Sequence, residues 1–174
     1  YVVYYGNADR LSEYFAMVNP EFAHTALYKT FAKQVANAKN TVIGADLVDI
    51  ALADAEGNVI KVSELCNAGK WVLVDFWATW CGPCRGEIPH LVEAYAEFAP
   101  KGLEIYGITF DRNGDTEKWQ NFVKENNMTW INVWGTDEKG GWSAGEAYNV
   151  SSIPSNFLFS PEGKLVAKNL RGDD

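Results

Sequence analysis

The stretch Trp80-Cys81-Gly82-Pro83-Cys84 decides the fold, because it joins an apolar run to an amphipathic segment. Two cysteines separated by two residues can bridge where a strand turns into a helix. This predicts Cys81 at the N-terminal end of a helix and Cys84 in its first turn. Unsatisfied N–H groups and the positive end of the helix dipole favour an anion there, so Cys81 is expected to be a nucleophilic thiolate. Pro83 suits the first turn, and Gly82 leaves the approach open to the sulfur of another protein.

Two carboxylates are expected near the dithiol. Asp75 falls inside the apolar run of residues 72–77, which is typical of a central strand buried on both faces. Burial disfavours a charged carboxylate, so we expect the pKa of Asp75 to be raised towards neutrality. Glu87 is three residues beyond Cys84, one helical turn on, and is expected to face the same site. The alternative for Glu87 is the ordinary role of a solvated helix residue.

A second segment is expected to complete the site. Ile153-Pro154 precedes an apolar strand, and a cis peptide bond there would lay backbone beside the dithiol to pair with an incoming chain. The sequence permits the cis isomer without requiring it. Trp80 is expected on the open rim of the site, in contact with a partner. The expected partner-binding residues are therefore Trp80, Gly82, Pro83, Ile153 and Pro154.

The longer pattern resembles a known family. The segment 74–84 resembles the active-site segment of the thioredoxin superfamily. Three further features resemble its TlpA/ResA-like thiol-disulfide oxidoreductases: the lead-in at 46–57, the tripeptide Glu87-Ile88-Pro89, and the connection at 130–150. The resemblance extends over roughly residues 44–172.

This resemblance implies a fold, a chemistry and a location. The fold is α/β, a thioredoxin-like α/β/α sandwich with an N-terminal β-hairpin and a preceding helical segment. Cys81 attacks, Cys84 resolves, Glu87 and Asp75 assist proton transfer, and Pro154 is cis. The implied partners are protein thiols or disulfides and an upstream membrane or envelope electron donor. No cofactor is implied besides the redox-active disulfide Cys81–Cys84, and the implied location is the periplasm or cell envelope of a bacterium.

The direction of electron flow is left open by the residues. Gly-Pro between the cysteines resembles the reducing thioredoxins, so we expect reduction of partner disulfides. CxxC proteins of this fold nevertheless span roughly −270 to −120 mV. A disulfide-donating oxidase is therefore one alternative.

Two other kinds of site fit less well. A peroxiredoxin-like thiol peroxidase is built around one cysteine preceded by Pro and Thr; Thr79 is present but no Pro precedes it in the segment. A lone CxxC also fits half of a zinc site, but Cys66 is the only other cysteine and the two histidines, His24 and His90, are scattered. We therefore expect no metal. Cys66 itself is expected to be a small buried side chain, with a mixed disulfide as the minority alternative.

Composition excludes several classes of function. The net charge of −8 disfavours nucleic acid or an anionic membrane surface as the main partner. The sequence contains no stretch of 18 apolar residues, so we expect no transmembrane helix in it. An apolar content of 47% argues against disorder. The chain lacks an initiating Met and a leader, so a mature or trimmed form is expected.

The chain is predicted to have two parts. Residues 1–42 form an N-terminal helical segment, with helices over 11–18 and 22–38, which is either a spacer or the tail of a larger domain. Residues 43–174 form the thioredoxin-like domain, truncated before its last helix, because 170–174 resembles a helix start.

The second part is predicted to alternate strands and helices around one core. A hairpin over 44–62 leads to a short helix capped by Ser63. Three tryptophans are expected in the core: Trp71, Trp77 and Trp130. Phe98 is expected in the buried stripe of the helix over 85–98. The remaining expected strands are 103–110, 130–134, 156–159 and 164–168, and the remaining helices are 116–126 and 142–148.

Overall fold

The computed structural model describes residues 8–172 and is organised around a five-stranded sheet. Its strand order is β5-β4-β3-β6-β7. The strands β3, β4 and β5 are parallel, whereas β6 runs antiparallel to β3 and β7 antiparallel to β6. The bounds are β3 (Trp71–Trp77), β4 (Leu103–Thr109), β5 (Ile131–Trp134), β6 (Ser155–Phe159) and β7 (Leu165–Lys168).

The central strand is β3, as its apolar sequence predicts. Every residue of β3 after Trp71 is buried, because the strand has a hydrogen-bonded neighbour on each side and is covered on both faces. Asp75 is the one ionisable residue in this run. Strand β3 ends at Trp77, so the chain leaves the sheet immediately before the dithiol.

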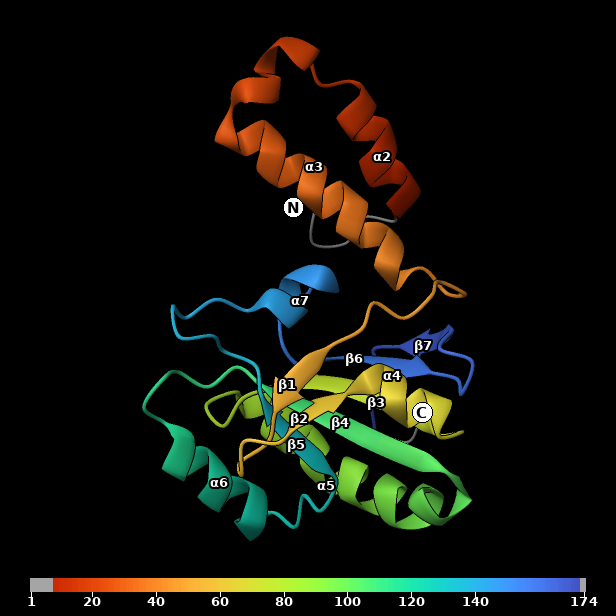
Figure 1. Ribbon diagram of the computed structural model, residues 1–174, viewed down its shortest axis with the longest axis vertical. Helices are drawn as coiled ribbons and strands as arrows, with labels where there is room; N and C mark the ends of the chain where they lie inside the picture. Colours follow the sequence, from red (N-terminus) through yellow and green to blue (C-terminus); the bar gives the residue numbers. More distant parts are fainter. Residues whose placement is uncertain (1–7, 173–174) are drawn as a thin grey trace.

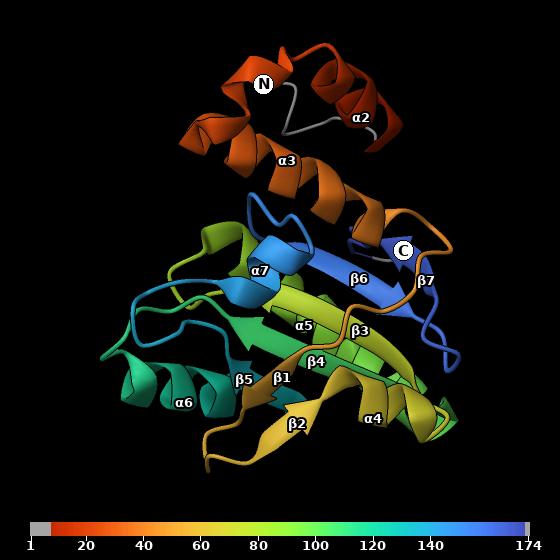
Figure 2. The same cartoon turned by 45° about the horizontal axis from the view of Figure 1, so that its top comes forward.

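Helices α5 (Gly82–Phe98) and α6 (Thr116–Glu125) cover one face of the sheet (Figure 1). The crossovers β3-α5-β4 and β4-α6-β5 step in the same direction across the sheet, and right-handed connections place both helices on the same side. The hairpin of β1 (Ala51–Ala53) and β2 (Val59–Lys61), with α4 (Val62–Asn67), lies in front of the sheet in Figure 2, whereas α5 lies behind it. The predicted α/β sandwich is confirmed.

The hairpin is shorter than its sequence suggests, since β1 and β2 have only three residues each. The hydroxyl of Tyr106 on β4 ties the hairpin to the sheet. It accepts the N–H of Leu52 at 3.2 Å and donates to the carbonyl of Ile60 at 2.8 Å. The buried Tyr106 therefore connects the hairpin to the core.

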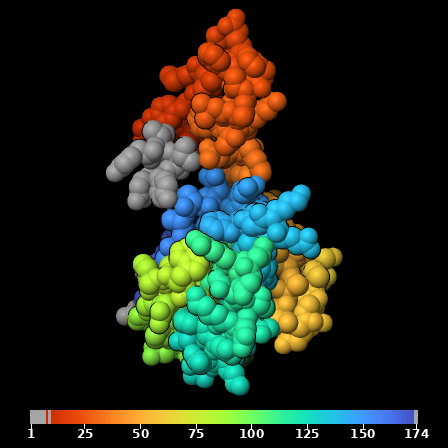
Figure 3. Space-filling view, turned by 90° about the vertical axis from the view of Figure 1, so that its left-hand side faces the viewer, coloured from red at the N-terminus to blue at the C-terminus, as the bar shows by residue number. Residues whose placement is uncertain are grey.

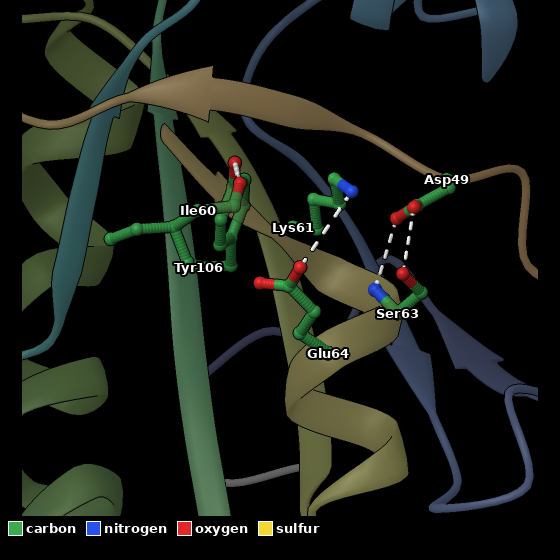
Figure 4. Close-up of polar contacts among 6 residues, drawn as sticks. All are labelled: Asp49, Ile60, Lys61, Ser63, Glu64 and Tyr106. Atoms are coloured by element: carbon green, nitrogen blue, oxygen red, sulfur yellow. Dashed lines mark hydrogen bonds and ion pairs between the residues drawn. The ribbon is translucent and has the colours of Figure 1, made fainter. Parts of the chain in front are cut away.

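The predicted cap of helix α4 is wrong. Helix α4 begins at Val62, one residue before Ser63, so Ser63 lies inside the first turn. There Ser63 donates hydrogen bonds to the side chain of Asp49 (Figure 4). The carboxylate of Asp49 accepts the Ser63 N–H at 3.0 Å and the Ser63 hydroxyl at 2.7 Å. A carboxylate near the first turn also interacts favourably with the positive end of the helix dipole.

The N-terminal helices form a unit of their own. They are α2 (Ala8–Ala16), the 3-10 turn η1 (Pro20–His24), α3 (Ala26–Ala38) and the turn η2 (Lys39–Thr41). Helix α3 begins later than predicted because Thr25 caps it, its hydroxyl accepting the Tyr28 N–H at 3.2 Å. A small cluster of Leu11, Val35 and Ala38 is separate from the main core. In Figure 3 this unit projects from the rest of the molecule.

The unit contacts the rest of the chain mainly through α7 (Ser143–Ala147). Lys33 pairs with Glu146 at 2.5 Å, and Asn37 donates to the carbonyl of the same glutamate at 2.7 Å. Asn40 donates to the carbonyl of Ala147 at 2.8 Å. The proposed boundary at residues 42 and 43 stays a prediction, and the expected helix start at 170–174 extends beyond the described residues.

The tryptophans divide almost as predicted. Trp77 and Trp130 are 1% and 5% exposed, whereas Trp80 is 53% exposed. Trp71 is 42% exposed, so its assignment to the core is wrong. It is the first residue of β3 and lies at the end of the sheet, beside a groove that it shares with Phe98. Phe98 ends α5 and is also exposed, contrary to its place in the predicted stripe.

Candidate active site

Cys81 and Cys84 form a disulfide at the N-terminus of α5, with an S–S distance of 2.02 Å and a Cα–Cα distance of 5.3 Å. Cys81 is the N-cap residue, and its sulfur accepts the backbone N–H of Cys84 at 3.2 Å. Pro83 lies in the first turn, where its missing N–H leaves no hydrogen bond unmade. Both cysteines therefore lie where the spacing predicts.

The disulfide is recessed beneath an exposed rim. Cys81 and Cys84 are 4% and 2% exposed, whereas Trp80, Gly82 and Pro83 are exposed. A Cβ placed on Gly82 would meet no heavy atom within 4 Å. The surface at Gly82, between the two cysteines in the sequence, is therefore open.

The Ile153–Pro154 peptide bond is cis. It precedes β6, whose first residue, Ser155, pairs with Phe76 near the end of β3. Because the dithiol follows the same end of β3, this register brings Pro154 to the edge of the sheet where Cys81 lies. Ile153 and Pro154 are both half-buried.

Asp75 is the buried carboxyl of this region. It is 6% exposed, and the register places Gly107 of β4 on one side of it and Asn156 of β6 on the other. Burial raises the pKa of Asp75 to about 7, with Glu87 adding to the rise. Arg171 and a hydrogen bond from Asn156 act in the opposite direction. The carboxyl therefore exchanges its proton near neutral pH, as the sequence predicts.

Glu87 lies close enough to Asp75 for the two charges to interact, so both sequence-predicted carboxylates are near each other. Glu87 is half-buried, and its carboxylate accepts the backbone N–H of Gly172 at 3.0 Å. It also lines a groove of about 460 Å³ together with Leu73, Asn156 and Arg171.

Sequence reasoning missed Asn156 and Arg171. The Asn156 amide exchanges hydrogen bonds with backbone groups of Leu170, at 2.8 and 3.0 Å, which holds the segment after β7 against the site. Arg171 donates to the carbonyl of Pro154 at 2.6 Å. The sequence around these two residues does not indicate a role in the site, because only the pairing of distant strands brings them close to Asp75.

Asp111 was missed as well, although it positions the segment before the dithiol. It is fully buried, and its carboxylate accepts the N–H of Thr79 at 3.0 Å, the hydroxyl of Thr79 at 2.6 Å and the hydroxyl of Thr109 at 2.5 Å. Thr79 follows β3 and Asp111 follows β4. Because parallel neighbouring strands end at the same edge of a sheet, this placement was a usable signal.

The described residues form no cluster of side chains that could bind a metal ion. Within residues 8–172, no group of three or more His, Cys, Asp or Glu residues is placed to hold a metal ion. Cys66 is 3% exposed and has no disulfide partner, and burial raises the pKa of its thiol. That agrees with the expected packing role. In the described chain, no helix has both the length and the apolar character needed to cross a lipid bilayer.

A disulfide between two cysteines that are separated by two residues, at the start of a helix and at the same sheet edge as a cis-proline, defines a redox protein of the thioredoxin fold. The chain belongs to the AhpC/TSA family, whose model matches residues 43–168. It is 35% identical to the thiol-disulfide oxidoreductase ResA of Bacillus subtilis (strain 168) over 123 residues, which cover 71% of this chain and 64% of that protein. The chain thus spans just under two thirds of that relative's length.

Other similar proteins and solved structures carry thiol-disulfide oxidoreductase or interchange names as well. ResA of a Bacillus cereus strain is 33% identical over 143 residues, covering 82% of this chain and 76% of that protein. The solution structure of a thiol:disulfide interchange protein from Bacteroides sp. has a TM-score of 0.68 at 36% identity, covering 77% and 85% of the two chains. A structure from Chlorobium tepidum, described as a putative thiol:disulfide interchange protein DsbE, has a TM-score of 0.63 at 28% identity, covering 75% and 86%.

These comparisons confirm the predicted class, a thiol-disulfide oxidoreductase of the ResA-like type. The relatives carry that name, which favours dithiol chemistry over the peroxidase alternative.

Proposed function

We propose that this chain reduces disulfides of bacterial envelope proteins by way of a mixed disulfide on Cys81. The observation that carries the proposal is the Cys81–Cys84 disulfide at the start of α5, which follows the strand that holds the buried Asp75 carboxyl. The helix N-terminus stabilises a thiolate on Cys81 once the disulfide is reduced. The envelope location rests on the resemblance to ResA-like proteins.

The reaction begins with the reduced dithiol. The Cys81 thiolate attacks one sulfur of the partner disulfide, forming a Cys81–partner disulfide and releasing the other partner sulfur as a thiolate. The Cys84 thiolate then attacks the Cys81 sulfur, which restores the Cys81–Cys84 disulfide and releases the second partner thiolate. The partner gains two electrons and two protons. An upstream dithiol in the membrane or envelope returns two electrons and two protons to the chain.

Proton transfer is assigned to Asp75 and Glu87. Cys84 must lose its proton before it resolves the mixed disulfide, and a carboxyl with a pKa of about 7 accepts a proton at neutral pH more readily than an ordinary carboxylate. Glu87 is half-buried, its charge interacts with Asp75, and it lines the surface groove of about 460 Å³. We assign Glu87 to passing the proton on towards solvent.

Partner binding is assigned to the rim of the disulfide. Trp80, Gly82 and Pro83 are exposed around the recessed sulfurs, and Ile153 and Pro154 come to the same edge of the sheet. An extended partner segment would pair with backbone at Ile153 while Trp80 contacts its side chains.

Trapping the intermediate tests the proposal. With Cys66→Ser as background, Cys84→Ser removes the resolving thiol, so a mixed disulfide with a peptide disulfide should accumulate on Cys81 and disappear on adding dithiothreitol. The matched Cys81→Ser variant should trap nothing. Mass spectrometry of the adduct gives the linked residue. An adduct on Cys84 in the Cys81→Ser variant, with none in Cys84→Ser, would reverse the assigned order of attack.

The disulfide-donating oxidase remains the second candidate, because the Cys81–Cys84 disulfide is the species that an oxidase would use. Equilibration with glutathione or dithiothreitol, in the Cys66→Ser background, gives the reduction potential. A value near the thioredoxin end, about −270 mV, supports reduction of partners, whereas a value near −120 mV supports disulfide donation.

A further inference from the structure

Gly107, in the middle of β4, faces three buried polar atoms that lack a partner. A Cβ placed on Gly107 would lie 3.0 Å from Oδ1 of Asn132, 3.1 Å from Nε1 of Trp130 and 3.3 Å from Nε1 of Trp77. Within the described part of the chain, none of these atoms has a hydrogen-bond partner. Trp77 and Trp130 are more than nine-tenths buried. Such atoms are costly to leave unpaired, and their convergence on one point indicates a ligand.

The amide of Asn132 is oriented by its own contacts. Its Nδ2 donates to the carbonyl of Met128 at 3.0 Å and to that of Trp130 at 2.9 Å. Oδ1 is therefore the atom turned towards Gly107. The three atoms provide two N–H donors and one acceptor.

We propose that this cradle, formed by Gly107, Trp77, Trp130 and Asn132, binds a single internal water molecule. Water accepts both indole N–H groups and donates one hydrogen to Oδ1 of Asn132, which satisfies all three atoms. Buried waters typically make about three hydrogen bonds of this kind. A Cβ at Gly107 would lie within 3.3 Å of all three atoms, so a methyl group there would crowd a water bound to them.

The proposed water lies close to a surface cavity and to a residue of the candidate active site. Trp130 and Asn132, which supply two of the three atoms, also line a surface cavity of about 740 Å³. The register pairs Gly107 with Asp75 on β3 and with Asn132 on β5. Registered neighbours of parallel strands point to the same face and lie about 4.8 Å apart. The water therefore lies on the Asp75 side of the sheet, one strand away.

Water-edited NMR of the oxidised, nitrogen-15-labelled full chain tests this inference. The indole N–H signals of Trp77 and Trp130, assigned with Trp→Phe variants, should show rotating-frame cross-peaks to water. Gly107→Ala should abolish both and leave the Trp119 indole signal unchanged. Gly86→Ala is the matched control, because a Cβ there meets no heavy atom within 4 Å, and it should keep both cross-peaks.

Absence of water cross-peaks at both indoles in the unaltered chain would overturn the inference, as would their persistence in folded Gly107→Ala. If that variant does not fold, a high-resolution crystal structure of the unaltered chain decides. An ordered solvent peak at about 2.7–3.2 Å from the three atoms supports the site, and featureless density there refutes it. Neither outcome depends on the proposed direction of electron flow.

Discussion

Asp75 shows how one residue sets the behaviour of the site. Burial inside β3 raises its pKa, whereas Arg171 and Asn156 limit the rise. The carboxyl is therefore held between its two protonation states near neutral pH. A hydrogen-bonded polar environment alone would lower the pKa, and an entirely apolar one would keep the group protonated. The combination suits a group that must both accept and release a proton.

The first prediction concerns the pH dependence of stability in the oxidised protein. The carboxyl of Asp75 has a pKa near 3.8 when unfolded and about 7 when folded. Between these values the folded state holds a proton that the unfolded state has lost, so raising the pH lowers stability. Asp75→Asn removes this effect and should be more stable than the unaltered protein above pH 7, by at most roughly 4 kcal/mol.

Urea unfolding of both oxidised proteins from pH 4 to pH 8 measures the difference. It should grow as the pH rises through this window and level off above it. Parallel pH profiles for the two proteins would show that Asp75 is not buried as a carboxyl with a raised pKa.

At the residue scale, much of the site is predictable from local sequence. Cys81, Cys84 and Asp75 carry their own signals, since a CxxC after an apolar run and a carboxylate inside it need no partner to be recognised. Asn156 and Arg171 reach the site only when β6 pairs with β3 and the segment after β7 returns to Pro154. That pairing depends on the fold as a whole.

Among the elements, those with long buried runs were predicted closely and those with weak patterns were not. Strand β3 lies within one residue of its predicted bounds, because a long apolar run is typical of a central strand buried on both faces. The weak alternation over residues 46–53 yielded only the short β1. The hydroxyl of Tyr106 connects β1 and β2 to the sheet, and this is a long-range contact that periodicity does not indicate.

The second prediction concerns the cap of α4. Asp49→Ala removes the acceptor for the Ser63 N–H and should cost about 1 kcal/mol, whereas Ser63→Ala keeps that bond and should cost less than about 0.5 kcal/mol. Asp49→Asn is the control, because it retains an acceptor oxygen and should recover most of the loss. Chemical denaturation gives the three values. A larger loss for Ser63→Ala would restore the serine as the cap.

At the scale of the whole molecule, two cores lie side by side without merging. The main core centres on the sheet, whereas Leu11, Val35 and Ala38 form a second cluster with Phe15 and Phe31. The contacts between the N-terminal helices and α7 are polar and mostly exposed. Exposed ion pairs contribute at most about 1 kcal/mol each to the free energy of unfolding. These contacts therefore orient the N-terminal helices and add little to the stability of the sheet.

The third prediction follows from this separation. A chain of residues 43–174 should fold, keep the reduction potential of the full chain within error, and lose little thermal stability, because no residue of the sheet core is removed. Circular dichroism and dithiothreitol equilibration measure these properties. Lys33→Ala in the full chain is the control for the exposed pair and should change stability by less than about 1 kcal/mol. If residues 43–174 are unfolded alone, the N-terminal helices are an integral part of the fold, and the proposed boundary is wrong.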